Sequence, residues 1–204
     1  EFTSKQDNFI SILMPAPVIA AQTCLREVVT EYSSTTSRAV LQHDLSEGSN
    51  VYASVSEGFK AGGYATYECT DAYNPEEVTS LEFGFKGSLS ESTSLNASIF
   101  RYDYSDFQVL QVIGIQTVTR NAGDATVNGL EIEAVSEIND SLSVTTGLTL
   151  LDATYGAFEN VNGVQPELGV QQLEGNYLSN SPKVSLNIGL NYFQNIESGG
   201  SITY

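Results

Sequence analysis

Residue types that commonly carry catalysis are scarce in this sequence. His43 is the only histidine, and a Ser-His-Asp hydrolase would need it beside a nucleophile and an acid. No partner motif accompanies it, so ordinary polarity at a surface or inside a channel is the favoured interpretation. The glycine-rich stretch 58–63 does not resemble a phosphate-binding loop, because no Gly-Lys-Ser/Thr precedes a helix there. We therefore expect no catalytic residue and predict that the chain is not an enzyme.

The two cysteines, Cys24 and Cys69, are the next residues that could do chemistry. They are too few to build a structural zinc site by themselves, and the sequence contains no other metal-ligand spacing. Two cysteines fit either a disulfide in an extracytoplasmic protein or two unrelated thiols. The sequence predicts no metal site and leaves both interpretations of the cysteines open.

The overall charge excludes one large class of partners. The chain has 204 residues, a formal net charge of -17 and a sequence pI near 4.1. Such a charge repels phosphate backbones, so we expect no nucleic-acid partner. A transmembrane helix needs about 20 apolar residues. The longest apolar stretch, 9–21, is too short and is interrupted by Pro15 and Pro17.

Segments of alternating apolar and polar residues are the elements that must position any functional side chain. In the clearest segment, 80–104, Leu81, Phe83 and Phe85 alternate with polar residues before a polar turn at 90–93. Segments with the same pattern lie at 40–44, 51–56, 127–136, 142–150 and 184–192. Successive side chains of a strand point to opposite faces, so each segment predicts a strand with one apolar and one polar face.

Two regularities favour a membrane barrel over a soluble fold. Short polar turns alternate with long connections, which predicts tight turns on one edge of a sheet and large loops on the other. The segments run roughly 9 to 12 residues, which is the length that a tilted strand needs to cross a bilayer. The pattern therefore predicts an all-β fold, the wall of an antiparallel transmembrane β-barrel with its apolar row toward lipid. A soluble all-β module, whose strands average nearer 5–6 residues, is the alternative.

The charged residues of these segments agree with that orientation. Glu82, Lys86, Glu131 and Glu133 fall on the polar row, where they could form a charge network facing a wet lumen. A lysine or arginine on the lipid face costs about 2–4 kcal/mol at the bilayer midplane and about 0–1 kcal/mol near the interfaces. Arg101 is the exception, because it continues the apolar row toward the long-loop end. It predicts either a contact with lipid head groups or a bulge that switches faces.

A series of short motifs runs along the chain: GFKAGG at 58–63, NPE at 74–76, EFGFK at 82–86, F-x-x-x-Y-x-D-x-Q at 100–108, NAG at 121–123, GLEIE at 129–133, DATY at 152–155, LEG at 173–175 and SP at 181–182. In their order and spacing, these motifs resemble the β-barrel of TonB-dependent outer-membrane receptors. Each motif alone is weak, but together they are specific, and the resemblance covers 41–192.

The resemblance implies a 22-stranded barrel closed around an N-terminal plug domain, in the outer membrane of a Gram-negative cell. It also implies uptake of a scarce ligand, most often a ferric siderophore, driven by TonB through the plug. Iron would arrive inside the ligand, so we expect no cofactor. The chain has room for roughly eight strands and no plug, so we expect 38–204 to be part of the barrel and 1–37 to be a strand end with an irregular loop. A small complete outer-membrane barrel and a soluble β-rich adhesin or interaction protein are the alternatives.

Ligand contacts would be expected in the long loops. Plausible aromatic contacts are Tyr64, Tyr67, Tyr73 and Tyr155, although such residues could equally belong to an interfacial girdle. In the family, charged lumen residues usually support barrel and plug rather than bind ligand. If 40–44 and 51–56 form a hairpin, Cys24 and Cys69 would share the extracellular, long-loop edge, where a disulfide between them would persist.

Overall fold

The computed structural model describes residues 2–5, 29–64, 72–113, 116–161, 165–196 and 200–203. Cys24, Cys69 and Tyr67 lie outside the described residues, so their roles stay predictions. In the N-terminal range, strand β1 (Phe2–Lys5) pairs antiparallel with strand β2 (Val29–Tyr32).

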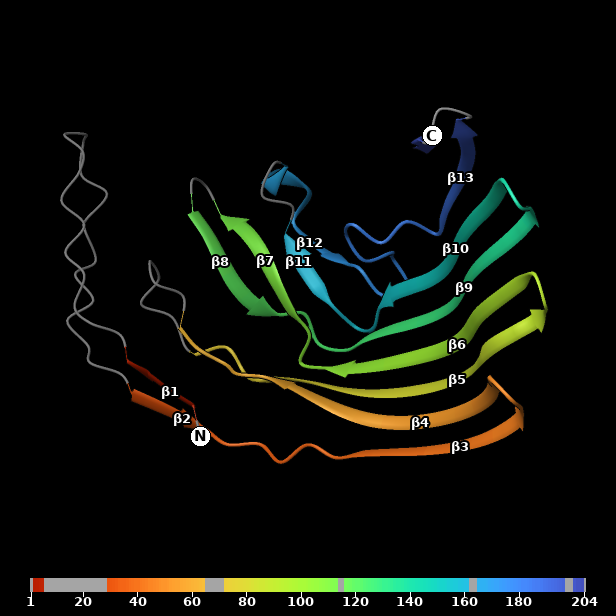
Figure 1. Ribbon diagram of the computed structural model, residues 1–204. Coiled ribbons are helices and arrows are strands. Elements are labelled where there is room, and N and C mark those ends of the chain that lie inside the picture. Colours follow the sequence, from red (N-terminus) through yellow and green to blue (C-terminus); the bar gives the residue numbers. More distant parts are fainter. Residues whose placement is uncertain are drawn as a thin grey trace.

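Eight of the described strands form one curved antiparallel sheet (Figure 1). In spatial order these are β14 (Gly200–Thr203), β13 (Val184–Ile196), β10 (Leu142–Tyr155), β9 (Ala125–Asn139), β6 (Thr93–Ser105), β5 (Glu76–Ser90), β4 (Ser49–Lys60) and β3 (Arg38–Ser46). The prediction of about eight meandering strands is confirmed. Strands β3 and β14 are the two ends of the order, so the described part is an open wall and does not form the small closed barrel considered as an alternative.

Two small hairpins lie outside this sheet, in the connections at one end of its strands. The first pairs β7 (Gln108–Ile113) with β8 (Gln116–Asn121), and the second pairs β11 (Glu159–Val161) with β12 (Val170–Gln172). A 3₁₀ turn, η1 (Pro166–Leu168), lies between β11 and β12. Both hairpins belong to the long connections, so these connections carry structure of their own (Figure 1).

The two edges of the sheet differ as the sequence predicts. Turns of two residues join β3 to β4, β5 to β6 and β9 to β10, and they lie together at one edge (Figure 1). The first of these turns contains Gly48 with φ +82°, a conformation that glycine adopts without steric cost. Connections 61–75, 106–124 and 156–183 lie at the opposite edge. We call this opposite edge the loop rim.

The strand register separates an apolar face from a polar face. Across strands β4, β5, β6 and β9, one row of neighbours is Ala53, Phe83, Ile99 and Leu130. The adjacent row, on the other face, is Tyr52, Gly84, Ser98 and Glu131. Large side chains of the apolar face are exposed, including Phe83 at 57% and Ile99 at 56%. A contiguous exposed apolar surface of this kind requires a covering, which lipid provides for a barrel wall.

Arg101 stays on the apolar face near the loop rim. Strand β6 keeps its register with both neighbours around this residue, so the bulge considered as an alternative is absent there. Its guanidinium makes a two-pronged contact with Asp103, at 2.8 Å from Nε to Oδ2 and 2.7 Å from Nη2 to Oδ1. This geometry neutralises a cation on the apolar face close to where the strand ends.

Two glycines on the polar face leave room for aromatic rings from neighbouring strands. A Cβ on Gly84 would lie 2.5 Å from both Cε1 and Oη of Tyr52. A Cβ on Gly129 would likewise lie 2.5 Å from Cε2 of Phe100. Tyr52 and Phe100 therefore lie flat over backbone that has no side chain, and these rings replace the packing that a glycine cannot supply.

Tight burial is confined mainly to the loop rim. Among the described residues, the buried apolar side chains are Phe100, Val118, Ala122, Ala125 and Ala153. Ala125 begins β9 and pairs with Tyr104, near the rim end of β6. None of the helical segments in the described ranges has the length and apolarity needed to cross a membrane.

Candidate functional site

The four charged residues predicted to face a lumen do share the polar face. They surround one hollow of about 220 Å³, whose lining includes Glu82, Lys86, Glu131, Glu133, Tyr52, Asn96 and Ser98. The register explains the arrangement, because Asn96 pairs with Lys86 on one side and with Glu133 on the other. The hollow is therefore a product of cross-strand neighbours on β4, β5, β6 and β9.

Tyr52 joins the charged residues of this hollow. Its hydroxyl donates a hydrogen bond to Oε1 of Glu82, and Nζ of Lys86 lies 5.2 Å from the centroid of its ring. Within the described part of the chain, no ion pair joins Lys86 to the glutamates. The contacts therefore run through a tyrosine that the sequence analysis did not single out. Its position on the polar row opposite Gly84 was the available signal.

A row of aromatic rings marks the loop rim. Tyr104 and Phe107 meet edge to face with centroids 5.2 Å apart, and Phe107 meets Tyr155 at 6.3 Å. Tyr155 in turn lies 5.5 Å from Phe158, which precedes β11. The predicted ligand residue Tyr155 thus belongs to a packed aromatic row that joins the second and third long connections.

Of the other predicted tyrosines, Tyr64 and Tyr73 are described, and they lie at the base of the first long connection. Gly63 and Tyr73 pair through two backbone hydrogen bonds, of 3.1 and 2.8 Å, and Tyr64 follows this pair directly. The hydroxyl of Tyr32, from β2, donates a 3.4 Å hydrogen bond to the carbonyl of Tyr73. The base of the connection is therefore closed, with both tyrosines half-buried beside it.

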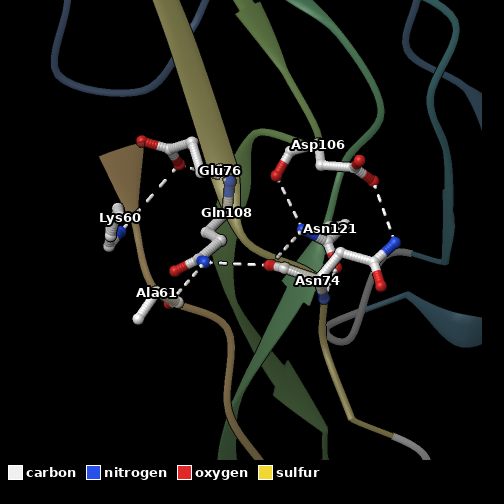
Figure 2. Close-up of polar contacts among 7 residues, drawn as sticks. All are labelled: Lys60, Ala61, Asn74, Glu76, Asp106, Gln108 and Asn121. Atoms are coloured by element: carbon white, nitrogen blue, oxygen red, sulfur yellow. Dashed lines mark hydrogen bonds and ion pairs between the residues drawn. The ribbon is translucent and has the colours of Figure 1, made fainter. Parts of the chain in front are cut away.

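Asn121 stands at the centre of a polar cluster at the loop rim (Figure 2). Its Oδ1 accepts a 2.6 Å hydrogen bond from the backbone N–H of Asn74. Its Nδ2 donates to the carbonyl oxygens of Asn74, at 3.1 Å, and Asp106, at 2.6 Å. Asn74 also donates from its own Nδ2 to Oδ1 of Asp106, at 3.2 Å. Three segments distant in sequence meet at this side chain.

Gln108 completes the cluster on its other side (Figure 2). Its Nε2 donates to the carbonyl oxygens of Ala61 and Asn74, each at 3.0 Å. Its backbone N–H donates to Oε2 of Glu76 at 2.6 Å, and that same oxygen lies 3.9 Å from Nζ of Lys60. The cluster therefore ties both ends of the first connection to the start of β7.

The third long connection joins the second by further polar contacts. Nε2 of Gln111, on β7, donates to Oδ1 of Asn160, on β11. The backbone N–H of Gly156 donates to the carbonyl of Asp124 at 2.7 Å. The three connections thus form one assembly at the rim, and within the described residues no group of three or more histidine, cysteine or acidic side chains is placed to hold a metal ion.

Long antiparallel strands with an exposed apolar face, a polar opposite face and structured loops on one edge define the wall of a transmembrane β-barrel. The sequence matches the family model described as TonB dependent receptor-like, beta-barrel over residues 20–204, so the chain belongs to this family. The family is one of receptors and transporters rather than of enzymes. A comparison of the sequence with curated proteins finds no match.

Several solved structures share this fold. The chain is similar to the ferric yersiniabactin uptake receptor FyuA from Yersinia pestis, with 17% identity and a TM-score of 0.67 over 87% of this chain and 26% of that chain. It is similar to BauA, the ferric preacinetobactin receptor from Acinetobacter baumannii, with 18% identity and a TM-score of 0.61 over 90% and 26%. It is also similar to the copper transporter OprC, with 17% identity and a TM-score of 0.54 over 78% and 24%. The chain spans about a quarter of the length of these proteins.

Proposed function

We propose that this chain forms part of the barrel wall of an outer-membrane receptor that takes up a scarce ligand, a ferric siderophore, in a Gram-negative cell. One observation carries the proposal: three long connections converge at one rim of the sheet, above the polar face. There they build an aromatic row beside a dense hydrogen-bond cluster. Structured loops on one rim of a barrel are suited to capture a ligand on the outer surface.

The two faces of the sheet support the proposed location and route. The exposed apolar face would contact lipid of the outer membrane, and the polar face would line the lumen. The hollow around Tyr52 presents hydroxyl, amide and carboxylate groups that would support a plug domain carried elsewhere in the whole protein. TonB would deliver energy to that plug.

The chemistry of the rim supports a ligand that brings its own metal. The described rim presents aromatic rings and amides, and iron would enter inside an organic chelate that such groups can contact. FyuA and BauA are named for ferric ligands, whereas OprC is named as a copper transporter. One fold thus serves different cargoes.

Uptake by the whole receptor tests this proposal. The receptor would be expressed in an iron-starved Gram-negative host that lacks its own siderophore receptors, with TonB either present or deleted. Radioactive iron would be supplied in turn as catecholate, hydroxamate and mixed-type siderophore complexes, with radioactive copper as the comparison. We expect accumulation of at least one ferric complex, only when TonB is present. The proposal would be overturned if the cells accumulated none of the ferric complexes, whether or not they accumulated copper. It would also be overturned if a ferric complex accumulated without TonB.

A further inference from the structure

We propose that Asn74, Asp106, Gln108 and Asn121 form a clasp that makes the two described ends of the first connection, 61–64 and 72–75, move as one body with strands β7 and β8. The clasp would position two segments of the rim relative to each other. Its relevance to ligand capture rests on the proposed function, because those segments would contact the ligand. The mechanical coupling itself requires no ligand and can be measured without one.

The strand ladders of the wall do not supply this coupling. The β4–β5 ladder stops at the pair of Lys60 with Glu76, and the β6–β9 ladder stops at the pair of Tyr104 with Ala125. Beyond those pairs, Phe107 exchanges backbone hydrogen bonds with Gly123 and Ala122, and β7 and β8 then form a two-stranded sheet with no ladder to the first connection. The clasp contacts, together with the hydrogen bond from the Gln108 N–H to Glu76 at the start of β5, hold the hairpin against the described ends of the connection.

Asn121 can fill this role because it uses both halves of its carboxamide at once. Oδ1 accepts from the backbone of Asn74, while Nδ2 donates to two carbonyl oxygens, of Asn74 and Asp106. An aspartate would have nearly the same shape but no donor, and its charge would face those two carbonyl oxygens. Only an amide satisfies the groups that converge there, so asparagine at the end of β8 is specifically required.

Gln108 and Asp106 fix the opposite side of the clasp. Gln108 donates from Nε2 to Ala61 and Asn74, which lie at the two ends of the connection, and thereby closes it. Asp106 adopts φ 52°, a left-handed conformation that is uncommon outside glycine and asparagine-like residues. This backbone turn directs its carbonyl to Asn121, while its carboxylate accepts from Asn74.

The clasp is also joined covalently to the base of the connection, where Gly63 and Tyr73 pair. Tyr73 precedes Asn74 and holds Gly63 by backbone hydrogen bonds in both directions. Gly62 beside it has no room for a side chain, because a Cβ there would lie 2.7 Å from the ring of Tyr32. Because Tyr73 is covalently joined to Asn74, loss of the clasp should loosen the Gly63–Tyr73 pair.

Amide hydrogen exchange of the whole receptor in lipid bilayers, without ligand, tests this coupling. The variants are Asn121→Asp, which keeps the acceptor but removes both donors, and Gln108→Glu, which does the same on β7. Asn128→Asp is the matched control, because Asn128 lies on β9 outside the clasp and its Oδ1 accepts from Arg101 at 3.5 Å. In both clasp variants the amides of Gly63 and Tyr73 should exchange on the order of tenfold faster than in the control.

The pattern of exchange decides between coupling and a merely local role. Faster exchange confined to β7 and β8, with Gly63 and Tyr73 unchanged, would overturn the proposal. Faster exchange throughout β5 and β6 in Asn121→Asp would indicate general destabilisation of the sheet. In that case the exchange of the Gly63 and Tyr73 amides in Gln108→Glu would decide whether the coupling exists. Failure of siderophore uptake would leave this result intact, so the two proposals fail separately.

Discussion

Replacement of Gly84 by alanine tests how the polar face is packed. The ring of Tyr52 lies over Gly84, and a new Cβ would stand 2.5 Å from two of its atoms. Ordinary contact begins near 3.4 Å, so the ring would have to retreat by about 1 Å. That retreat would weaken the hydrogen bond from the Tyr52 hydroxyl to Glu82 and the contact of Lys86 with the ring.

The expected change in the free energy of unfolding combines two costs and one gain. Overpacking costs about 1–3 kcal/mol, and weakening a hydrogen bond to a charged group costs up to about 1.5–3 kcal/mol. Alanine itself is favoured over glycine within a strand by about 0.5–1 kcal/mol. Because Tyr52 is only half-buried, we expect Gly84→Ala to lower the free energy of unfolding by about 1–3 kcal/mol.

A double-mutant cycle with Tyr52→Ala isolates the contact. The free energy of unfolding would be measured by urea titration of the whole receptor in lipid bilayers. Once the ring is absent, Gly84→Ala should become neutral or stabilising by about 0.5–1 kcal/mol. An equal loss of stability in both backgrounds would show that the substitution does not act through Tyr52, and the reasoning would be refuted.

Four further substitutions probe other parts of the wall by the same titration. Ile99→Lys places a cation on the apolar face and should lower the free energy of unfolding by about 2–4 kcal/mol if that face meets the bilayer midplane. Ser98→Lys places the cation in the lining of the acidic hollow and should change the free energy of unfolding by less than about 0.5 kcal/mol. Similar costs for the two substitutions would contradict the orientation of the faces. Gly129→Ala should cost about 1–3 kcal/mol through its clash with Phe100, and a neutral result would remove that packing argument. Arg101→Ala should cost less than about 1 kcal/mol because its ion pair is half-exposed, and a larger loss would indicate a buried role.

Alternation along the strands made the wall predictable. Where one face is apolar, a shift of one residue would move every side chain to the other face, so the pattern alone specifies which side each residue takes. Leu81, Phe83 and Glu82 lie on the predicted faces for this reason. The strands extend beyond the predicted ranges, as in β4, because backbone ladders continue past the point where alternation fades near Gly58.

The rim assembly was not predictable in the same way. In the sequence, NPE at 74–76 and NAG at 121–123 are recognisable as family motifs, but neither motif indicates that Asn74 and Asn121 meet. Their contact depends on where three connections return to the sheet, and side-chain periodicity contains no information about that. The same limit applies to Tyr52, whose partners Glu82 and Lys86 come from a neighbouring strand.

Accessibility of spin labels along β6 tests the central claim, a barrel wall with one face in lipid, most directly. Single cysteines at 95, 96, 97, 98 and 99 would be labelled in the whole receptor in lipid bilayers, with the native cysteines replaced by serine. Labels at 95, 97 and 99 should be accessible to oxygen dissolved in lipid, and labels at 96 and 98 should be shielded from it, with a period of two. Uniform accessibility, or lipid exposure of 96 and 98, would contradict the account.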